Sequence, residues 1–166
     1  LGSRFNQKLS DLPSGLKHLD LGYMFNQSLG DLPYGLKFLK TSFCFNQVLV
    51  PGNLPTTLTQ LEFGARFNQP LDPGTLPEGL TRVVFGSDFN QTVEGVIPRS
   101  VRYLVFGLQF NRPLGRHTLP PGLLSLKLGL RFNQSLCSGM LPPGLKTLCP
   151  DFSIKKCSHL CQTCRV

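Results

Sequence analysis

The chain has 166 residues, of which 40% are hydrophobic and 16% charged, enough for one domain with a sizeable core. No run approaches 18 consecutive apolar residues, so nothing indicates a transmembrane helix. The formal net charge of +8 is uneven: residues 1–94 hold 7 Lys/Arg and 8 Asp/Glu, whereas residues 95–166 hold 10 Lys/Arg and one acid, Asp151. A basic half favours an anionic partner. The alternative is that these charges only keep the surface solvated.

A Phe-Asn pair recurs at intervals of 20 to 22 residues, with asparagines at Asn6, Asn26, Asn46, Asn68, Asn90, Asn111 and Asn133. A Leu-Pro or Ile-Pro pair recurs with it, and each of the first six prolines precedes the next of these asparagines by 13 residues. The length variation therefore lies between Phe-Asn and the next proline, which predicts a loop there and a rigid segment elsewhere. Such a fixed period indicates a repeat architecture.

Within the rigid segment, apolar residues alternate with variable ones, as in Leu19 and Leu21 or Leu61 and Phe63. This period of two predicts a β-strand of about four residues in each repeat. Glycine follows most of the expected strands, whereas the second repeat has Thr41 and Ser42 there.

The pattern is close to that of leucine-rich repeats, and it more specifically resembles the FNIP repeat. Runs such as Phe67-Asn68-Gln69-Pro70-Leu71 and Leu76-Pro77-Glu78-Gly79-Leu80 carry the resemblance, which covers nearly all of residues 1–148. We therefore expect a repeat solenoid with one sheet of short parallel strands, loops and turns on the opposite side, and little helix. Seven repeats, the first of them truncated, would fill residues 1–148. A cysteine-rich cap would follow at residues 149–166.

The repeated asparagines and phenylalanines have structural explanations. A turn after each strand leaves backbone groups without partners, and a buried asparagine side chain both donates and accepts hydrogen bonds. Stacked asparagines would thus form a ladder between neighbouring coils. The phenylalanines before them would stack as a spine in the core.

Two rows of side chains should point outward, because they alternate with the core positions. The first outward row is His18, Phe38, Gln60, Arg82, Tyr103 and Ser125, and the second outward row is Asp20, Lys40, Glu62, Val84, Val105 and Lys127. Arg82, Val84, Tyr103 and Val105 would form one mixed patch. Exposed apolar residues beside Tyr and Arg are typical of protein-binding hot spots, so we expect these twelve residues to bind a partner. The alternative is that Val and Tyr merely suit a strand surface.

Five of the six cysteines lie near the C-terminus: Cys137, Cys149, Cys157, Cys161 and Cys164. Four of these cysteines could supply the thiolates of a zinc site: Cys149, Cys157, Cys161 and Cys164. His159 is a further candidate ligand. Disulfides and free thiols remain equal alternatives, the first implying a secreted protein. Cys44 stands alone and is expected to be a small buried residue.

No enzyme motif is present, since His18, His117 and His159 fall in different repeats or in the tail, away from any recognisable nucleophile or phosphate loop. The sequence therefore predicts a protein–protein interaction scaffold with no cofactor and no small-molecule substrate. Its partner would be another protein, and the basic half favours one with an acidic surface. The rival hypotheses are binding of nucleic acid or an anionic membrane by the basic half, and a structural or surface repeat protein. The family resemblance implies an intracellular protein.

Overall fold

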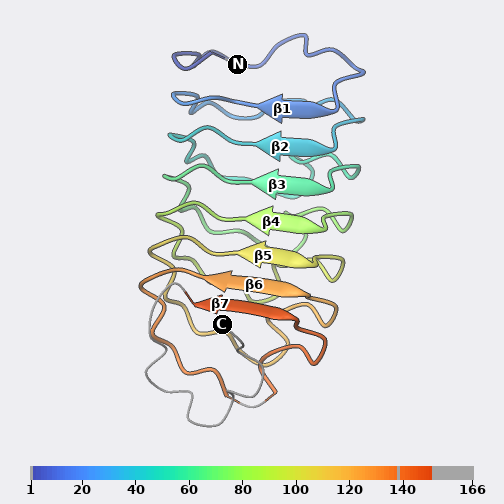
Figure 1. Cartoon of the computed structure of the whole chain (residues 1–166). Helices are drawn as coiled ribbons and strands as arrows, with labels where there is room; N and C mark the ends of the chain where they lie inside the picture. Colours follow the sequence, from blue (N-terminus) through green and yellow to red (C-terminus); the bar gives the residue numbers. More distant parts are fainter. Residues whose placement is uncertain (1, 138, 151–166) are drawn as a thin grey trace.

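The computed structural model describes residues 2–137 and 139–150, which form one coil after another around a common axis (Figure 1). Each coil contributes one short strand to a seven-stranded sheet. The strands are β1 (His18–Asp20), β2 (Phe38–Lys40), β3 (Gln60–Glu62), β4 (Arg82–Val84), β5 (Tyr103–Val105), β6 (Ser125–Leu128) and β7 (Thr147–Pro150). The predicted solenoid is confirmed, with strands of three or four residues.

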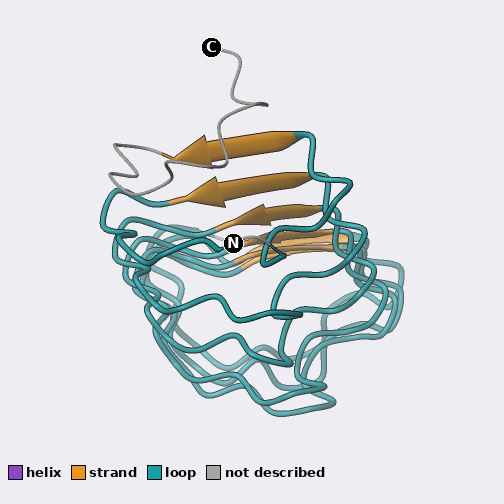
Figure 2. Cartoon of the chain, turned by 90° about the horizontal axis from the view of Figure 1, so that it is seen from below, coloured by secondary structure: helices purple, strands orange, loops and turns teal. Residues whose placement is uncertain are grey.

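All neighbouring strands are parallel and follow each other in chain order, so the repeat register is preserved across the sheet. Leu19 pairs with Leu39, and Leu61 with Val83, so equivalent repeat positions face each other on successive strands. Figure 2 shows the sheet on one side and the loops returning on the other, with no helix in the described part of the chain. The last strand continues to Pro150, where its backbone pairs with Leu128.

The core lies between the sheet and the return loops. Its central feature is a column of phenylalanines, one for each Phe-Asn pair, with Phe25, Phe45, Phe67, Phe89 and Phe110 fully buried. Their rings are nearly parallel and follow one another at 6.0 to 6.4 Å. The predicted spine is therefore present. Three middle strands are followed by a second buried phenylalanine, whose ring stacks on the first column at 3.8 to 4.1 Å: Phe63, Phe85 and Phe106.

A hydrogen-bonded ladder of asparagines runs beside the phenylalanine column. In each of six steps, the backbone N–H of one asparagine donates to Oδ1 of the asparagine in the preceding coil, at 2.8 to 3.0 Å. The following residue often completes the step: Gln47, Gln69 and Gln91 donate from Nε2 to the backbone carbonyl of the preceding asparagine. Arg112, which replaces glutamine, donates there from Nε at 2.8 Å.

Two expectations about burial were wrong. The ladder asparagines were expected to be buried, but they are half-buried, and Asn6 and Asn133 are exposed. The ladder needs only the Oδ1 edge of each side chain, so the rest of it can lie at the surface. Cys44 was also expected to be buried, but it is half-buried, because its position falls on the turn between the strand and the phenylalanine column.

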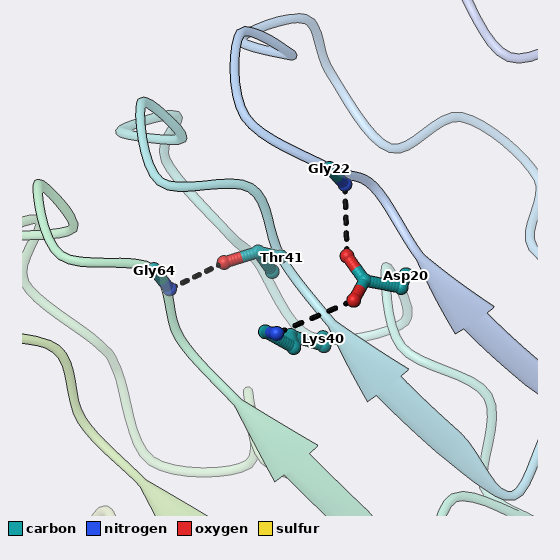
Figure 3. A network of polar contacts seen from close by, with 5 residues as sticks. All are labelled: Asp20, Gly22, Lys40, Thr41 and Gly64. Carbon is teal, nitrogen blue, oxygen red and sulfur yellow. Dashed lines mark hydrogen bonds and ion pairs between the residues drawn. The ribbon is translucent and has the colours of Figure 1, made fainter. Parts of the chain in front are cut away.

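Glycines after the strands let consecutive coils approach each other closely. A Cβ added at Gly86 would lie 1.9 Å from the carbonyl oxygen of Gly64, and one added at Gly107 would lie 2.0 Å from that of Gly86. A side chain at either glycine would force the backbones of the two coils apart. Ser42 occupies this position in the second repeat, and its buried hydroxyl donates to the carbonyl of Phe25. Thr41 beside it accepts a hydrogen bond from the backbone N–H of Gly64 (Figure 3).

The variable loops contain a tight turn that favours glycine. In four repeats its third residue is a glycine with φ between +70° and +95°: Gly52, Gly74, Gly95 and Gly139. The residue after each glycine donates its backbone N–H back to the first residue of the turn, as in type II turns. In the sixth loop this position is held by His117, with φ of +69°. Left-handed backbone costs a non-glycine residue about 1–2 kcal/mol.

Candidate functional site

The two outward rows lie where the sequence predicted them, on the open face of the sheet. The first and third residues of β1 to β6 are exposed or half-buried, while the residue between them is buried. The first row continues to Thr147 in β7, which pairs with Ser125, and the second to Cys149, which pairs with Lys127. The sheet face thus carries two parallel rows of side chains on every strand.

The N-terminal half of this face is mostly polar apart from the half-buried Phe38, and its charged side chains are paired. Lys40 Nζ lies 3.3 Å from Asp20 Oδ2 on the neighbouring strand, and both side chains are about half exposed. The Oδ1 of Asp20 accepts a hydrogen bond from the backbone N–H of Gly22 at 2.8 Å (Figure 3). Burial tends to raise the pKa of Asp20, but the Gly22 hydrogen bond and the charge of Lys40 outweigh this, so the pKa lies below its ordinary value of 3.8.

The middle of the face is mixed, as the sequence predicted. Arg82 pairs with Tyr103 and Val84 with Val105 in the register of β4 and β5, so the four residues form one patch. The side chain of Tyr103 is 47% exposed, and the two valines are half-buried. Arg82 Nε lies 3.6 Å from Glu62 Oε1, which links this patch to β3. An aromatic ring, aliphatic surface and a guanidinium therefore meet on the sheet.

A second apolar cluster lies past the ends of the first strands, and sequence analysis missed it. We call Tyr23, Met24, Phe43 and Arg66 the edge cluster. The rings of Tyr23 and Phe43 stack at 4.7 Å with an angle of 7°, and the Arg66 guanidinium lies 5.8 Å from the Phe43 ring centroid. Tyr23, Met24 and Phe43 are 38% to 49% exposed. The missed signal was a column of large apolar residues three positions before the asparagines: Tyr23, Phe43, Leu108 and Leu130.

The cysteine-rich tail lies almost wholly outside the described residues. Of the four possible zinc ligands, only Cys149 falls within them, where it is exposed on β7. Cys157, Cys161, Cys164 and His159 lie outside, as does nearly all of the expected cap at residues 149–166. Zinc, disulfides and free thiols therefore all stay predictions.

Residues 2–137 and 139–150 contain no group of three or more His, Cys, Asp or Glu side chains that could hold a metal ion. They also contain no helix long and apolar enough to span a bilayer. The histidines His18 and His117 lie far apart in the fold, one on β1 and the other in the loop before β6.

Comparison with known proteins agrees with the repeat pattern. The family model of the FNIP repeat matches residues 5–30, 25–66, 67–109 and 110–149, which together span most of the chain. The chain belongs to the FNIP repeat family. This FNIP repeat solenoid is also similar to the crystal structure of CroV588, described as a novel circular LRR protein, with 40% sequence identity and a TM-score of 0.85. The match covers 89% of this chain but 22% of that one. Among curated proteins, no sequence matches this chain.

Proposed function

We propose that this FNIP repeat scaffold binds another protein through the open face of its sheet. The observation that supports the proposal is the patch of Arg82, Val84, Tyr103 and Val105, in which a half-exposed tyrosine lies on aliphatic surface beside an arginine. Tyrosine and arginine are enriched among the residues that dominate the energetics of protein interfaces. The rigid sheet holds them in fixed register, so little conformational entropy would be lost on binding.

The edge cluster would extend this surface past the ends of β1, β2 and β3. Its two stacked rings and the Arg66 guanidinium are exposed to solvent, and none of them belongs to the buried core. On β1, β2 and β3 the charged side chains of Asp20, Lys40 and Glu62 are partly exposed. A partner contacting both clusters would therefore meet apolar side chains together with polar groups, as in most reversible interfaces.

We also infer that the chain has no catalytic role. Enzymatic catalysis needs a nucleophile, a base and charge-stabilising groups that converge in one pocket. The outward rows instead present a shallow surface of mixed chemistry, with the titratable pairs Asp20–Lys40 and Glu62–Arg82 engaged with each other. A repeat solenoid of this kind presents an extended surface for recognition.

The test is affinity capture from the native source, with the repeat chain as bait and quantitative comparison of variants. The double variant Arg82→Ala with Tyr103→Ser should weaken capture of the partner about thirtyfold or more, because a single hot-spot residue contributes about 2 kcal/mol. A matched control replaces the same residue types away from the sheet face: Arg116→Ala with Tyr34→Ser, both exposed. Equal capture by the two double variants, at unchanged melting temperature, would refute the sheet face as the binding site.

Binding of a polyanion is the second candidate, favoured by the basic half of the chain. Its described cations are exposed on several sides of the solenoid: Arg99, Arg102, Arg112, Arg116, Arg131 and Lys146. Because they do not share one face, this binding would be weak and non-specific. It predicts a steep loss of affinity for duplex DNA or anionic vesicles as salt rises. Sheet-face substitutions would leave that affinity unchanged.

A further inference from the structure

A cleft of about 670 Å³ lies on the return segments that lead into the last strands, away from the open sheet face. Successive coils each contribute the residue that follows the repeated proline, so equivalent positions line it in register: Glu78, Arg99, Pro121 and Pro143. His117 and Met140 from the variable loops complete the wall. The cleft therefore combines two basic side chains, one acid and an apolar surface.

His117 is the unusual residue of this cleft. It occupies the turn position that four other repeats give to glycine, with φ of +69°. Its loop makes the same turn as theirs, since the backbone N–H of Thr118 donates to the carbonyl of Gly115. Glycine would therefore be the more relaxed residue there. A histidine with left-handed backbone on the wall of a cleft points to a role in ligand binding.

The shape of the cleft limits what could bind. Glu78, Arg99, Pro121 and Pro143 precede β4, β5, β6 and β7, so the cleft crosses four coils. At about 4.8 Å per parallel strand, this corresponds to a length of roughly 14 Å. An extended peptide advances about 3.4 Å per residue, so four or five residues would fill it. Proline surfaces along the wall suit aliphatic side chains.

We propose that this cleft binds an extended acidic peptide segment of another protein. The guanidinium of Arg99 donates to a carboxylate of the segment, and an imidazole N–H of His117 donates to the same or the next carboxylate. Glu78, at the other end of the cleft, favours a peptide N–H or a cationic side chain there, which sets the direction of the segment. Met140 and the prolines contact its apolar side chains. The site is separate from the sheet face and does not depend on the function proposed for it.

The probe is a fluorescein-labelled octapeptide of alternating leucine and glutamate, measured by fluorescence anisotropy. A leucine–glutamine octapeptide is the neutral control. We expect Arg99→Gln and His117→Gly each to weaken binding of the acidic peptide about tenfold, as for a lost charge-assisted hydrogen bond. Glu78→Gln should strengthen it. The matched control is Arg116→Gln, which removes the same charge one residue before His117 but does not line the cleft, and which should change affinity less than twofold.

His117→Gly keeps the test independent of folding, because glycine suits this turn and the melting temperature should stay equal or rise. Equal loss of affinity in Arg99→Gln and Arg116→Gln would show a general basic field and overturn the proposal. It would also be overturned if the glutamine peptide bound as tightly, or if free glutamate competed at the same concentration as the peptide. The last result would indicate a site for small carboxylates instead.

Discussion

Asn68 accepts a hydrogen bond through Oδ1 from the backbone N–H of Asn90, one coil further along, at 2.9 Å. The same contact joins each pair of neighbouring coils from Asn6 to Asn133. Gln91 adds a second link, since its Nε2 donates to the carbonyl of Asn68 at 3.1 Å. Each coil thus offers two acceptors to the next coil, the Oδ1 and the backbone carbonyl of its asparagine. These contacts fix the position of the next coil.

Removing one step of this ladder should destabilise the whole solenoid. In Asn68→Ala the backbone N–H of Asn90, which is half-buried, loses its acceptor, so we expect a loss of about 1–3 kcal/mol. The control is Asn53→Ala, whose Oδ1 only accepts from Val50 within an exposed loop and should cost about 0.5–1 kcal/mol. Urea unfolding measures both. Equal losses in the two variants would mean that the ladder does not stabilise the stack.

The sequence predicted the ladder and the outward rows because both repeat in strict register. Once the strand period and the Phe-Asn spacing were known, the side on which Tyr103 or Lys40 lies followed directly. The edge cluster was missed because Tyr23 and Phe43 lie in a turn, where no simple period says which side chains face solvent. The sequence also did not predict that the asparagine side chains accept while the following glutamine side chains donate. These roles depend on distances between coils, which a sequence does not contain.

The role of glycine after the strands was similarly hidden. A glycine there was predicted to end the strand, but the structure shows that it allows close approach between coils. The Cβ of Gly86→Ala would lie 1.9 Å from the carbonyl oxygen of Gly64, so the backbone of two coils must shift. We expect a destabilisation of about 3 kcal/mol or more. Gly15→Ala, where no heavy atom lies within 4 Å, should stay within about 0.5 kcal/mol of wild type. Melting temperatures of the two variants test this, and similar values would contradict it.

The Asp20 carboxylate should make stability dependent on pH in the acidic range. Its pKa is lowered in the folded state, so the folded protein binds the proton less readily than the unfolded chain. The stabilisation is then fully present above the unfolded pKa near 3.8 and is lost as pH falls through the lower folded pKa. Asp20→Asn should therefore be less stable than wild type at pH 7 and equal to it at strongly acidic pH. Thermal unfolding measured from pH 7 downward tests this, and a constant difference between the two proteins would contradict it.

The phenylalanine column should respond differently at its middle and at its beginning. Phe89 is fully buried, between Phe67 at 6.0 Å and Phe110 at 6.3 Å, whereas Phe5 is half-buried and stacks on Phe25 at 5.9 Å. Phe89→Ala leaves a cavity within the continuous core and should cost about 3–5 kcal/mol. Phe5→Ala should cost about half as much or less, since part of its ring already contacts water.

The two variants should also differ in where the damage appears, because a solenoid is held together by contacts between neighbouring coils. Hydrogen exchange in Phe5→Ala should become faster mainly in the coil before β1. In Phe89→Ala it should become faster in β3, β4 and β5 together, since rings from those coils stack against the lost side chain. If Phe89→Ala does not fold, Phe89→Leu provides the same comparison with a smaller loss of folding free energy. Faster exchange confined to the coil that carries the substitution would show that the phenylalanine column does not couple the coils.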